Sequence, residues 1–524
     1  LGPLGMDKVI KESKKKIIIT NDGATILEKA KVEGEIRKMI RELSIGQDQE
    51  VGDGTTGVVV LAGSLLEQAE KLIQRGIHPS RICEGFEHAN DICMSYLEEI
   101  AESMGENIEI LPCLLAAAST AVNSKVINRS KKRLAEICTK AVLAVSDLDR
   151  RDVNLDLIKI DGKVGGTLEN TCLVNGVVID KEFSHHQMPK EIKDARICIL
   201  SSPLEPPKSK TKQKIEIETV EKYKDLELAE KNFFKDMISQ IKNSGANFLI
   251  CQWGFDDEGN HLLLRNKIPA VRWVSGSELE LLAISTGAHI SPRFNEITTS
   301  SLGFAGKVRE ITIGTDQERI LVIEDGSQVK SVTIFVRGGS QLVINEAKRA
   351  IWDALCAIRN LIRDNRILTG GGSCEMACSI KISNQSENLE GFKHYIFNAF
   401  SEALKIIPFT LAENAGYSPI ETLSNLQVKQ TVEGSPYFGI GCRGKMVSDL
   451  RKDRIFETLI SKQQQFQAVI QMVSAILRID DILHAKIILQ KTRNFHKFFN
   501  KVFIFNLTLR QIFQFFPTSK EIFL

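Results

Sequence analysis

The chain has 524 residues, which is too long for one compact core, and about three domains are expected at this length. Hydrophobic residues make up 43% and charged residues 26%, as in ordinary globular proteins, and the net charge of +2 gives no reason to expect binding to nucleic acid or to an anionic membrane. No uninterrupted apolar span has membrane length, and the eleven cysteines contain no CxxC pair, so we expect reduced core cysteines in a cytoplasmic protein.

The first predicted elements end in a turn with a carboxylate. Residues 14–19 predict a strand, which the turn Asn21-Asp22-Gly23 closes. Asp22 therefore lies at a strand end. A charged amphipathic helix is predicted over residues 28–50.

A glycine-rich loop follows at Val51-Gly52-Asp53-Gly54-Thr55-Thr56-Gly57, and an apolar helix begins directly after it. Glycines let the backbone pass close to a ligand, and the amides and dipole of a helix N-terminus favour an anion. Asp53 is suited to hold a hard cation such as Mg2+, which would bridge to phosphate oxygens. The alternative is an ordinary loop with a threonine N-cap.

The middle of the chain has the pattern of an α/β unit. A helix is predicted from Pro79 to about Met104, and two more between Leu111 and Val145. The basic stretch 203–214 predicts a solvated loop, and the His185–His186 pair has no further residue at metal-ligand spacing. Short apolar runs predict strands near residues 157–160, 177–179, 197–200, 248–251 and 270–274.

A helix is predicted from about Gln341 to Arg363, with a glycine turn, Gly370-Gly371-Gly372, after it. Asp353 lies about 200° around the helix from Ile351 and is therefore predicted off the buried face. A carboxylate in such a position is usually only solvated. The buried stripe is predicted to contain Ile344, Ala347, Ile351, Leu355, Ile358 and Ile362.

Several motifs resemble the group II chaperonins, the TCP-1 family, and in particular their eukaryotic cytosolic branch. The early ones are LGPLGMDK, TNDGATIL and GDGTTGVVVLAG, and later stretches such as RRDVNLDLIKIDGKVGG, ICQWGFDDEGNHLLL and RNLIRDNR agree. The match covers about residues 1–482. It implies an α+β multidomain chaperonin fold with a mostly helical equatorial domain, a small α/β intermediate domain, and an α/β apical domain with a helical protrusion that serves as a lid. Trp253 to Leu264 resembles that protrusion.

The resemblance also implies a discontinuous domain order, in which the two ends fold together and the middle is an insertion. The implied parts are equatorial 1–106, intermediate 107–177, apical 178–330, intermediate 331–365, equatorial 366–482 and an unassigned tail 483–524.

The implied site binds ATP and Mg2+, with Asp53 as the metal ligand. Asp22 and Asp353 are the implied catalytic residues, because they would orient the water that attacks the γ-phosphate. The implied nucleotide-binding residues are Gly2, Pro3, Gly23, Gly52, Gly54, Thr55, Thr56, Ser124, Gly371, Glu457 and Lys462.

Two departures concern the stretch near Gly441. Residues 439–445 nearly spell a phosphate-binding P-loop, but Met446 stands where Ser or Thr must bind Mg2+, so a P-loop is not expected. The family's GID motif has an aspartate where this chain has Gly441, which predicts weaker nucleotide affinity.

The ends depart from the family as well. A segment of several dozen residues that precedes LGP in the family is not in this sequence, and residues 483–524 have no counterpart. Residues 495–523 hold nine of the 25 phenylalanines and predict at most a poorly packed amphipathic helix.

The implied function is ATP-driven folding of client proteins, such as actin and tubulin, inside two back-to-back rings of eight different subunits. Two alternatives stay open at the level of sequence. The first is a ring member that binds clients without hydrolysing ATP, and the second is a truncated product that does not assemble.

Overall fold

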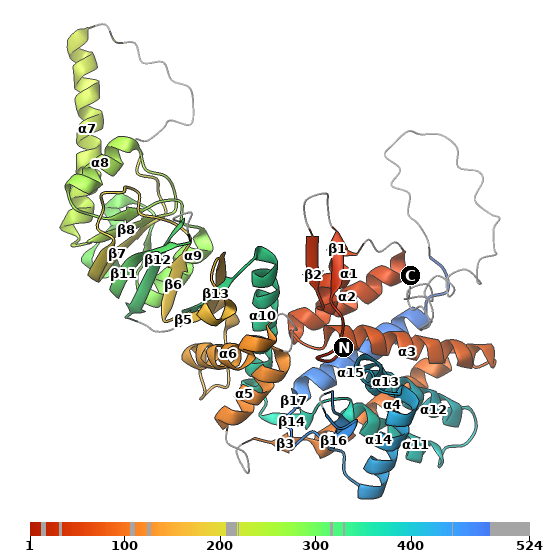
Figure 1. Ribbon diagram of the computed structural model, residues 1–524. Helices are drawn as coiled ribbons and strands as arrows, with labels where there is room; N and C mark the ends of the chain where they lie inside the picture. Colours follow the sequence, from red (N-terminus) through yellow and green to blue (C-terminus); the bar gives the residue numbers. More distant parts are fainter. Residues whose placement is uncertain are drawn as a thin grey trace, which may run out of the picture. The chain divides into compact units, whose positions relative to one another are not determined.

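The computed structural model describes residues 1–11, 17–30, 34–104, 110–122, 127–205, 217, 219–314, 318–327, 331–442 and 444–482. The chain divides into two compact units, coloured along the sequence in Figure 1. Unit 1 contains residues 1–103 and the chain from 366 onward, and unit 2 contains residues 104–365. The finer division of the chain into equatorial, intermediate and apical parts stays a prediction. Among the described residues, no helix is long and apolar enough to cross a bilayer.

Unit 1 is mostly helical, and its core forms around α3 (Thr55–Gln74). Leu61, Leu65 and Leu72 recur at helical spacing and are buried, as predicted, because α3 is packed against α2, α12 and α15. The other helices of unit 1 are α1 (Gly23–Lys29), α2 (Glu35–Glu50), α4 (Pro79–Ile100), α11 (Ser373–Ser386), α12 (Phe392–Leu404), α13 (Ile406–Asn414), α14 (Pro419–Glu433) and α15 (Leu459–Leu477).

The strands of unit 1 are short and lie at the ends of its helices. A hairpin of β1 (Lys8–Lys11) and β2 (Ile17–Thr20) precedes α1. A three-stranded sheet has the order β17 (Phe456–Thr458), β14 (Arg366–Thr369), β3 (Glu102–Ser103). A second hairpin joins β15 (Phe438–Ile440) and β16 (Val447–Asp449). Early and late segments of the chain therefore pack together, since β14 pairs with β3 and α15 packs against α3.

Unit 2 contains two sheets. The larger includes neighbouring parallel strands β7 (Glu191–Leu200), β8 (Phe248–Cys251) and β9 (Ala270–Val271), with β10 (Ile290–Ser291) parallel to β7. Its antiparallel part consists of β11 (Gly303–Ile313), β12 (Glu318–Gly326) and β6 (Gly176–Ile179). The smaller sheet has the order β4 (Ile158–Val164), β13 (Val332–Gly338), β5 (Cys172–Val174). These sheets and helices confirm the predicted α+β fold.

The helices of unit 2 are α5 (Ile110–Ala121), α6 (Lys131–Val145), α7 (Val220–Asn243), α8 (Asp257–Arg265), α9 (Gly276–Thr286) and α10 (Gln341–Arg363). Helix α10 has the predicted bounds, and its stripe from Ile344 to Ile358 is buried, although Ile362 is only half-buried. Asp353 is half-buried and lies off that stripe, as predicted.

The prediction that Trp253 to Leu264 forms the projecting lid is wrong. Residues 257–265 form the short helix α8, which packs against α7 and buries Leu263 completely. The projecting helix of unit 2 is α7 (Figure 1), whose first turns at residues 220–225 are exposed while Phe234 and Ile241 are buried. The resemblance therefore assigned the protrusion to α8, whereas the preceding helix α7 projects.

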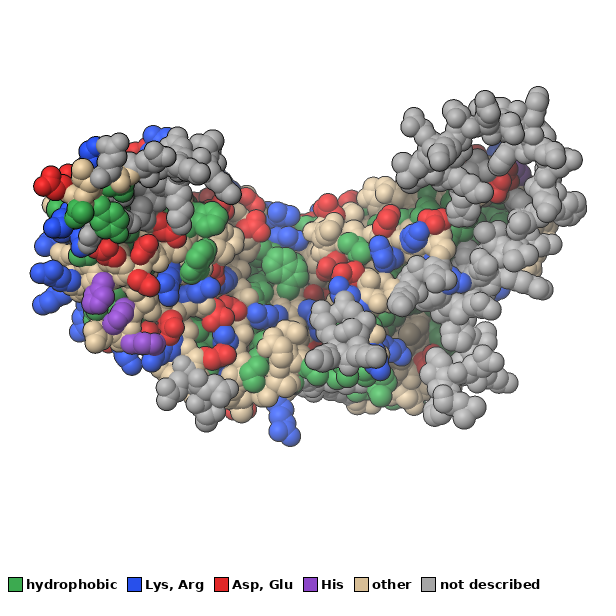
Figure 2. Space-filling model, turned by 90° about the horizontal axis from the view of Figure 1, so that it is seen from above, with side chains coloured by type: hydrophobic (Ala, Val, Ile, Leu, Met, Phe, Trp, Pro, Cys, Tyr) green, Lys and Arg blue, Asp and Glu red, His purple; other side chains and the backbone are tan. Residues whose placement is uncertain are grey.

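Most cysteines lie in these cores, as predicted. All eleven are thiols, and nine of them are buried, whereas Cys172 is exposed and Cys442 is half-buried. On the face shown in Figure 2, acidic and basic side chains are interspersed, in keeping with the small net charge.

Candidate functional site

The glycine loop begins α3 without a side-chain cap. Gly52 and Gly54 have φ values of +75° and +77°, in the left-handed region that favours glycine. Gly54 is the N-cap of α3, and no side chain caps this helix, so the threonine N-cap alternative is wrong. Gly54 belongs to the glycine loop, and the N–H groups at the start of α3 receive no side-chain cap, which is the kind of donor group that favours an anion.

Asp53 lies in this loop between Gly52 and Gly54. Its Oδ1 accepts a hydrogen bond of 2.7 Å from the N–H of Gly54. Burial raises the pKa of Asp53, while this hydrogen bond and the charge of Lys462 lower it. A carboxylate that has lost part of its hydration gains from a cation, so Asp53 fits the predicted role of metal ligand.

Asp22 connects the first turns of α1 and α3. Its Oδ1 accepts from the N–H of Ala24 at 3.2 Å and from the hydroxyl of Thr55 at 3.1 Å. Its Oδ2 accepts from the N–H of Thr25 at 3.0 Å and from the hydroxyl of Thr25 at 2.6 Å. Asp22 is thus the N-cap of α1, and the acceptor sites of its carboxylate are largely occupied.

Gly23 explains how closely the two turns approach each other. A Cβ at this position would lie 2.6 Å from the hydroxyl of Thr56 and 2.9 Å from its backbone nitrogen. Any side chain would therefore push the two turns apart. The structure accordingly brings together Asp22, Gly23, Thr55 and Thr56, which lie more than 30 residues apart in two groups.

Lys462 is buried between two carboxylates. Its Nζ lies 2.6 Å from Oε1 of Glu375 on α11 and 2.7 Å from Oε2 of Glu457 on β17. Burial opposes the charge of Lys462, but the two glutamates raise its pKa well above the ordinary value. The ammonium group of Lys462 is thus already paired with two protein carboxylates. Lys462 is better placed to orient Glu457 than to bind a phosphate.

Glu457 links this ion-pair cluster to the glycine loop. Burial raises its pKa, Lys462 lowers it, and the charges of Glu375 and Asp53 raise it further. Asp53, Glu375 and Glu457 carry three potential negative charges against the one positive charge of Lys462. A cation near Asp53 and Glu457 would relieve this excess. Among the described residues, no group of three metal-ligating side chains is preassembled, and Mg2+ commonly uses one or two carboxylates together with phosphate oxygens.

The turn Gly370–Gly372 reaches the same cluster from the late part of the chain. A Cβ on Gly370 would lie 3.0 Å from Oε1 of Glu457. Gly371 has φ +65°, and its carbonyl accepts from the N–H of Ile440 at 3.0 Å. Gly372 is the left-handed N-cap of α11, which, like α3, has no side-chain cap.

Gly2 lies against α13 and the turn after β15. It has φ +74°, and a Cβ there would lie 2.7 Å from the side chain of Leu411 and 3.9 Å from the sulfur of Cys442. Pro3 follows at an intermediate level of exposure. The role of these two residues in binding stays a prediction.

The near P-loop is a β-hairpin. Residues 439 and 440 belong to β15, and the strand β16 rather than a helix follows the motif, which confirms that it is not a P-loop. A Cβ on Gly441 would lie 2.4 Å from the carbonyl oxygen of Lys445, so this tight turn requires glycine.

For two further predicted residues, the role at the site stays a prediction. Asp353 belongs to α10 in unit 2, and its role at the phosphate stays a prediction. Ser124 lies outside the described residues.

Sequence reasoning missed Gln47 and Asp48 at the end of α2. The carbonyl of Gln47 accepts from Val51 and Gly52, and its Nε2 donates to the carbonyl of Asp53 at 3.1 Å. Burial and the neighbouring charge of Asp22 raise the pKa of Asp48. The only sequence signal is a pair of polar residues one turn before the glycine loop.

Comparison with known proteins assigns the class. The family model of the TCP-1/cpn60 chaperonin family matches residues 1–487, so the chain belongs to that family. This confirms the resemblance to chaperonins.

Individual members of the family are similar to this chain over most of its length. The T-complex protein 1 subunit epsilon of Encephalitozoon cuniculi (strain GB-M1) is 47% identical over 484 residues, which cover 92% of this chain and 90% of the relative. Thermosome subunits of Methanocaldococcus jannaschii and Methanothermococcus thermolithotrophicus are each 37% identical over 487 residues, or 93% of this chain. These matches cover 89% and 88% of the two thermosome subunits. The motifs quoted above also predict similarity to the epsilon subunit type, and the first of these relatives confirms it.

Proposed function

We propose that the chain is an ATP-binding and ATP-hydrolysing subunit of a chaperonin that folds client proteins. The observation that carries this proposal is the uncapped N-terminus of α3, which begins two residues after Asp53 and lies beside a cluster with excess negative charge. An anion would bind the helix N-terminus, and a divalent cation would offset the negative charge of the cluster. The Mg2+ complex of ATP contains both ions.

The phosphates would bind the N–H groups of Thr55 and Thr56, since the N–H of Gly54 donates to Asp53. Asp53 would bind the Mg2+ ion, which supplies neutralisation of phosphate charge when bound. Asp22 holds α1 against α3 through Thr55 and so fixes the shape of the phosphate loop. Because its carboxylate already accepts four hydrogen bonds, Asp22 is better suited to orient groups than to accept a proton.

Asp353 would then be the general base that takes a proton from the attacking water. It lies off the buried stripe of α10 and belongs to unit 2, whereas the phosphate loop belongs to unit 1. Hydrolysis would require the two units to close on each other, and ATP turnover would thereby drive a hinge movement. By family resemblance we infer a cytoplasmic hetero-oligomeric double ring, with actin and tubulin among the clients.

A client-binding subunit that does not hydrolyse ATP is the second candidate. It is favoured by Gly441, which replaces the family's aspartate in a turn too tight for a side chain. Phosphate release by the purified chain with ATP, in Mg2+ and in EDTA, separates the two candidates. We expect release that depends on Mg2+; binding without any release would establish the second candidate.

Asp53→Asn is expected to remove the effect of Mg2+ on ATP binding. The amide keeps an acceptor for the N–H of Gly54 but loses the charge that binds the ion. Titration calorimetry should show that the variant binds ATP equally in Mg2+ and in EDTA. Asp91→Asn, at an exposed position on α4, is the matched control and should behave as the parent. A Mg2+ effect of parental size in Asp53→Asn would refute the metal-ligand assignment.

Gln47→Met is expected to lower the affinity for Mg2+ and ATP by about 2–10-fold, because one hydrogen bond to the loop is lost. Folding stability should change little, since the buried Oε1 of Gln47 has no partner and is removed as well. The measurement is the same titration, accompanied by a thermal melt. Gln49→Met, at an exposed position two residues along α2, is the control. Unchanged affinity in Gln47→Met would show that Gln47 does not position Asp53.

A further inference from the structure

A surface pocket of about 480 Å3 in unit 2 is distant in sequence from the phosphate loop and has no role in the mechanism above. It lies where several strands end. Trp253 follows β8 by two residues, and Trp273 follows the neighbouring parallel strand β9 by two residues. Asp180 and Lys181 follow β6, and Ser275 to Glu278 begin α9. The carboxyl ends of parallel strands are a common position for ligand sites.

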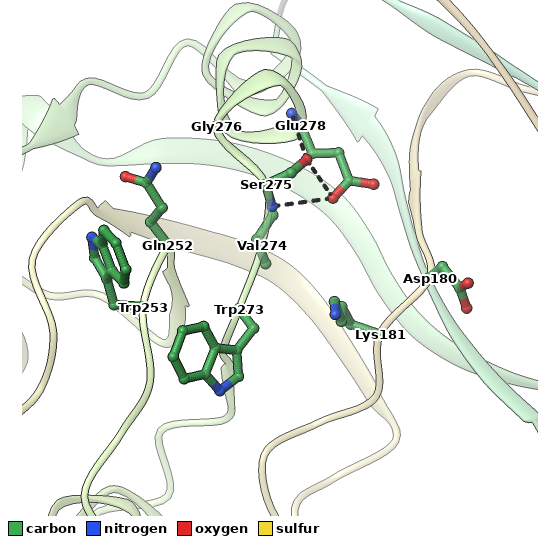
Figure 3. A pocket seen from close by; sticks show the side chains of 9 residues that line it. All are labelled: Asp180, Lys181, Gln252, Trp253, Trp273, Val274, Ser275, Gly276 and Glu278. Carbon is green, nitrogen blue, oxygen red and sulfur yellow. Dashed lines mark hydrogen bonds between the residues drawn. The ribbon is translucent and has the colours of Figure 1, made fainter.

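Two half-exposed tryptophans form one wall of the pocket, opposite Asp180 and Lys181 (Figure 3). Trp253 is 49% and Trp273 54% exposed, and their rings meet edge to face with centroids 6.3 Å apart. Tryptophan rarely shows this much surface without a partner, because its indole is the largest apolar side chain.

The local backbone is built to present Trp273 outward. Trp273 has φ +60°, a left-handed conformation that is costly for a bulky side chain. Gly254 makes room for the ring, since a Cβ there would lie 2.8 Å from Cζ2 of Trp273. The strained conformation and the glycine together hold the indole at the surface instead of in the core.

The two carboxylates that line the pocket form ion pairs with lysines of β4. Lys159 lies 2.6 Å from Glu278, and Lys163 lies 2.9 Å from Asp180. Glu278 also accepts from the hydroxyl and N–H of Ser275 in the capping box of α9, drawn as dashed lines in Figure 3. Among the described residues, Lys181 is therefore the charged group that the pocket presents to a ligand, next to the positive N-terminal end of α9.

We propose that this tryptophan pocket binds a polypeptide segment in which an aromatic side chain is flanked by acidic residues. The aromatic ring would lie against Trp253 and Trp273, and a neighbouring carboxylate would face Lys181 and the first turn of α9. The volume accommodates one or two large side chains and leaves the segment's backbone at the surface. This proposal rests on the proposed function, for which it names a class of client segment.

The test uses the full chain with Trp352→Phe, which leaves Trp253 and Trp273 as the two fluorescent indoles. Three synthetic Gly/Ser nonapeptides serve as probes: one with Phe between two Asp, one with Ala in place of Phe, and one with Phe between two Lys. We expect a saturable change of tryptophan emission with the first peptide and an apparent affinity at least about 10-fold lower for the other two. No nucleotide is present, so the outcome is independent of whether the chain hydrolyses ATP.

Variants locate the binding. With a fluorescein-labelled Phe/Asp peptide followed by anisotropy, Trp253→Ala and Trp273→Asn should each weaken binding about 10-fold, because each removes one aromatic face. Asparagine tolerates the left-handed backbone at residue 273, so that variant is expected to fold. Lys181→Glu should reverse the preference toward the Phe/Lys peptide, whereas Lys267→Glu, on an exposed turn outside the pocket, should not. Equal binding of the Phe and Ala peptides, or an unchanged preference in Lys181→Glu, would overturn the proposal.

Discussion

Replacing Asp353 with alanine is expected to slow ATP hydrolysis by about 10²–10⁴-fold, the usual loss when a positioned general base is removed. ATP binding should persist, because the phosphate loop and Asp53 belong to unit 1 and Asp353 to unit 2. Folding should also persist, since Asp353 lies off the buried stripe of α10. The change therefore separates chemistry from binding.

The measurement is single-turnover hydrolysis with the protein in excess over labelled ATP, together with titration of ATP binding. Asp236→Ala, which removes an exposed carboxylate from α7 in the same unit, is the matched control and should hydrolyse ATP at the parental rate. If Asp353→Ala also hydrolysed ATP at the parental rate, its assignment as the general base would be withdrawn.

Lys462→Met is expected to destabilise the region around α15 by about 3–5 kcal/mol, because it leaves a buried carboxylate without its partner. The side chain of Glu375 is only 1% exposed and that of Lys462 10%, so water cannot replace the lost ion pair. The double variant Lys462→Met with Glu375→Gln should recover part of the loss, since the orphaned charge is then removed.

Hydrogen exchange of the α15 amides measures this local stability. The fluorescence of the three tryptophans would not serve, because all of them lie in unit 2. Lys381→Met breaks the exposed pair of Lys381 with Glu99 and should cost at most about 1 kcal/mol. Equal effects of the two lysine substitutions would show that the buried cluster does not stabilise unit 1.

Patterns with a short period were sufficient to predict much of the fold. The bounds of α10 follow from its apolar stripe, and α3 follows from the leucines after the glycine loop. Both signals are local, because a helix repeats every few residues and its buried face is visible in the sequence. The error at Trp253 to Leu264 has another origin, because the family resemblance did not show which of two neighbouring helices, α7 or α8, projects.

The chemistry of the site depends on contacts between distant parts of the chain. The hydrogen bond from Thr55 to Asp22 spans 33 residues, and the ion pair of Lys462 with Glu375 spans 87. Contacts between residues so far apart leave no periodic pattern in the sequence. The motifs therefore identified candidate residues but did not show which side chains contact one another. Asp48 and Gln47 were overlooked for the same reason, since polar residues in a charged helix are common.

The proposed function requires Asp53 and Asp353 to act in the same transition state. The most direct test is a double-variant cycle of Asp53→Asn and Asp353→Ala, followed by single-turnover phosphate release in saturating Mg2+. Residues that act as a unit in one transition state are not additive, so the double variant should lose much less than the product of the two single losses. Losses that multiply, or single variants that keep the parental rate, would contradict a shared site.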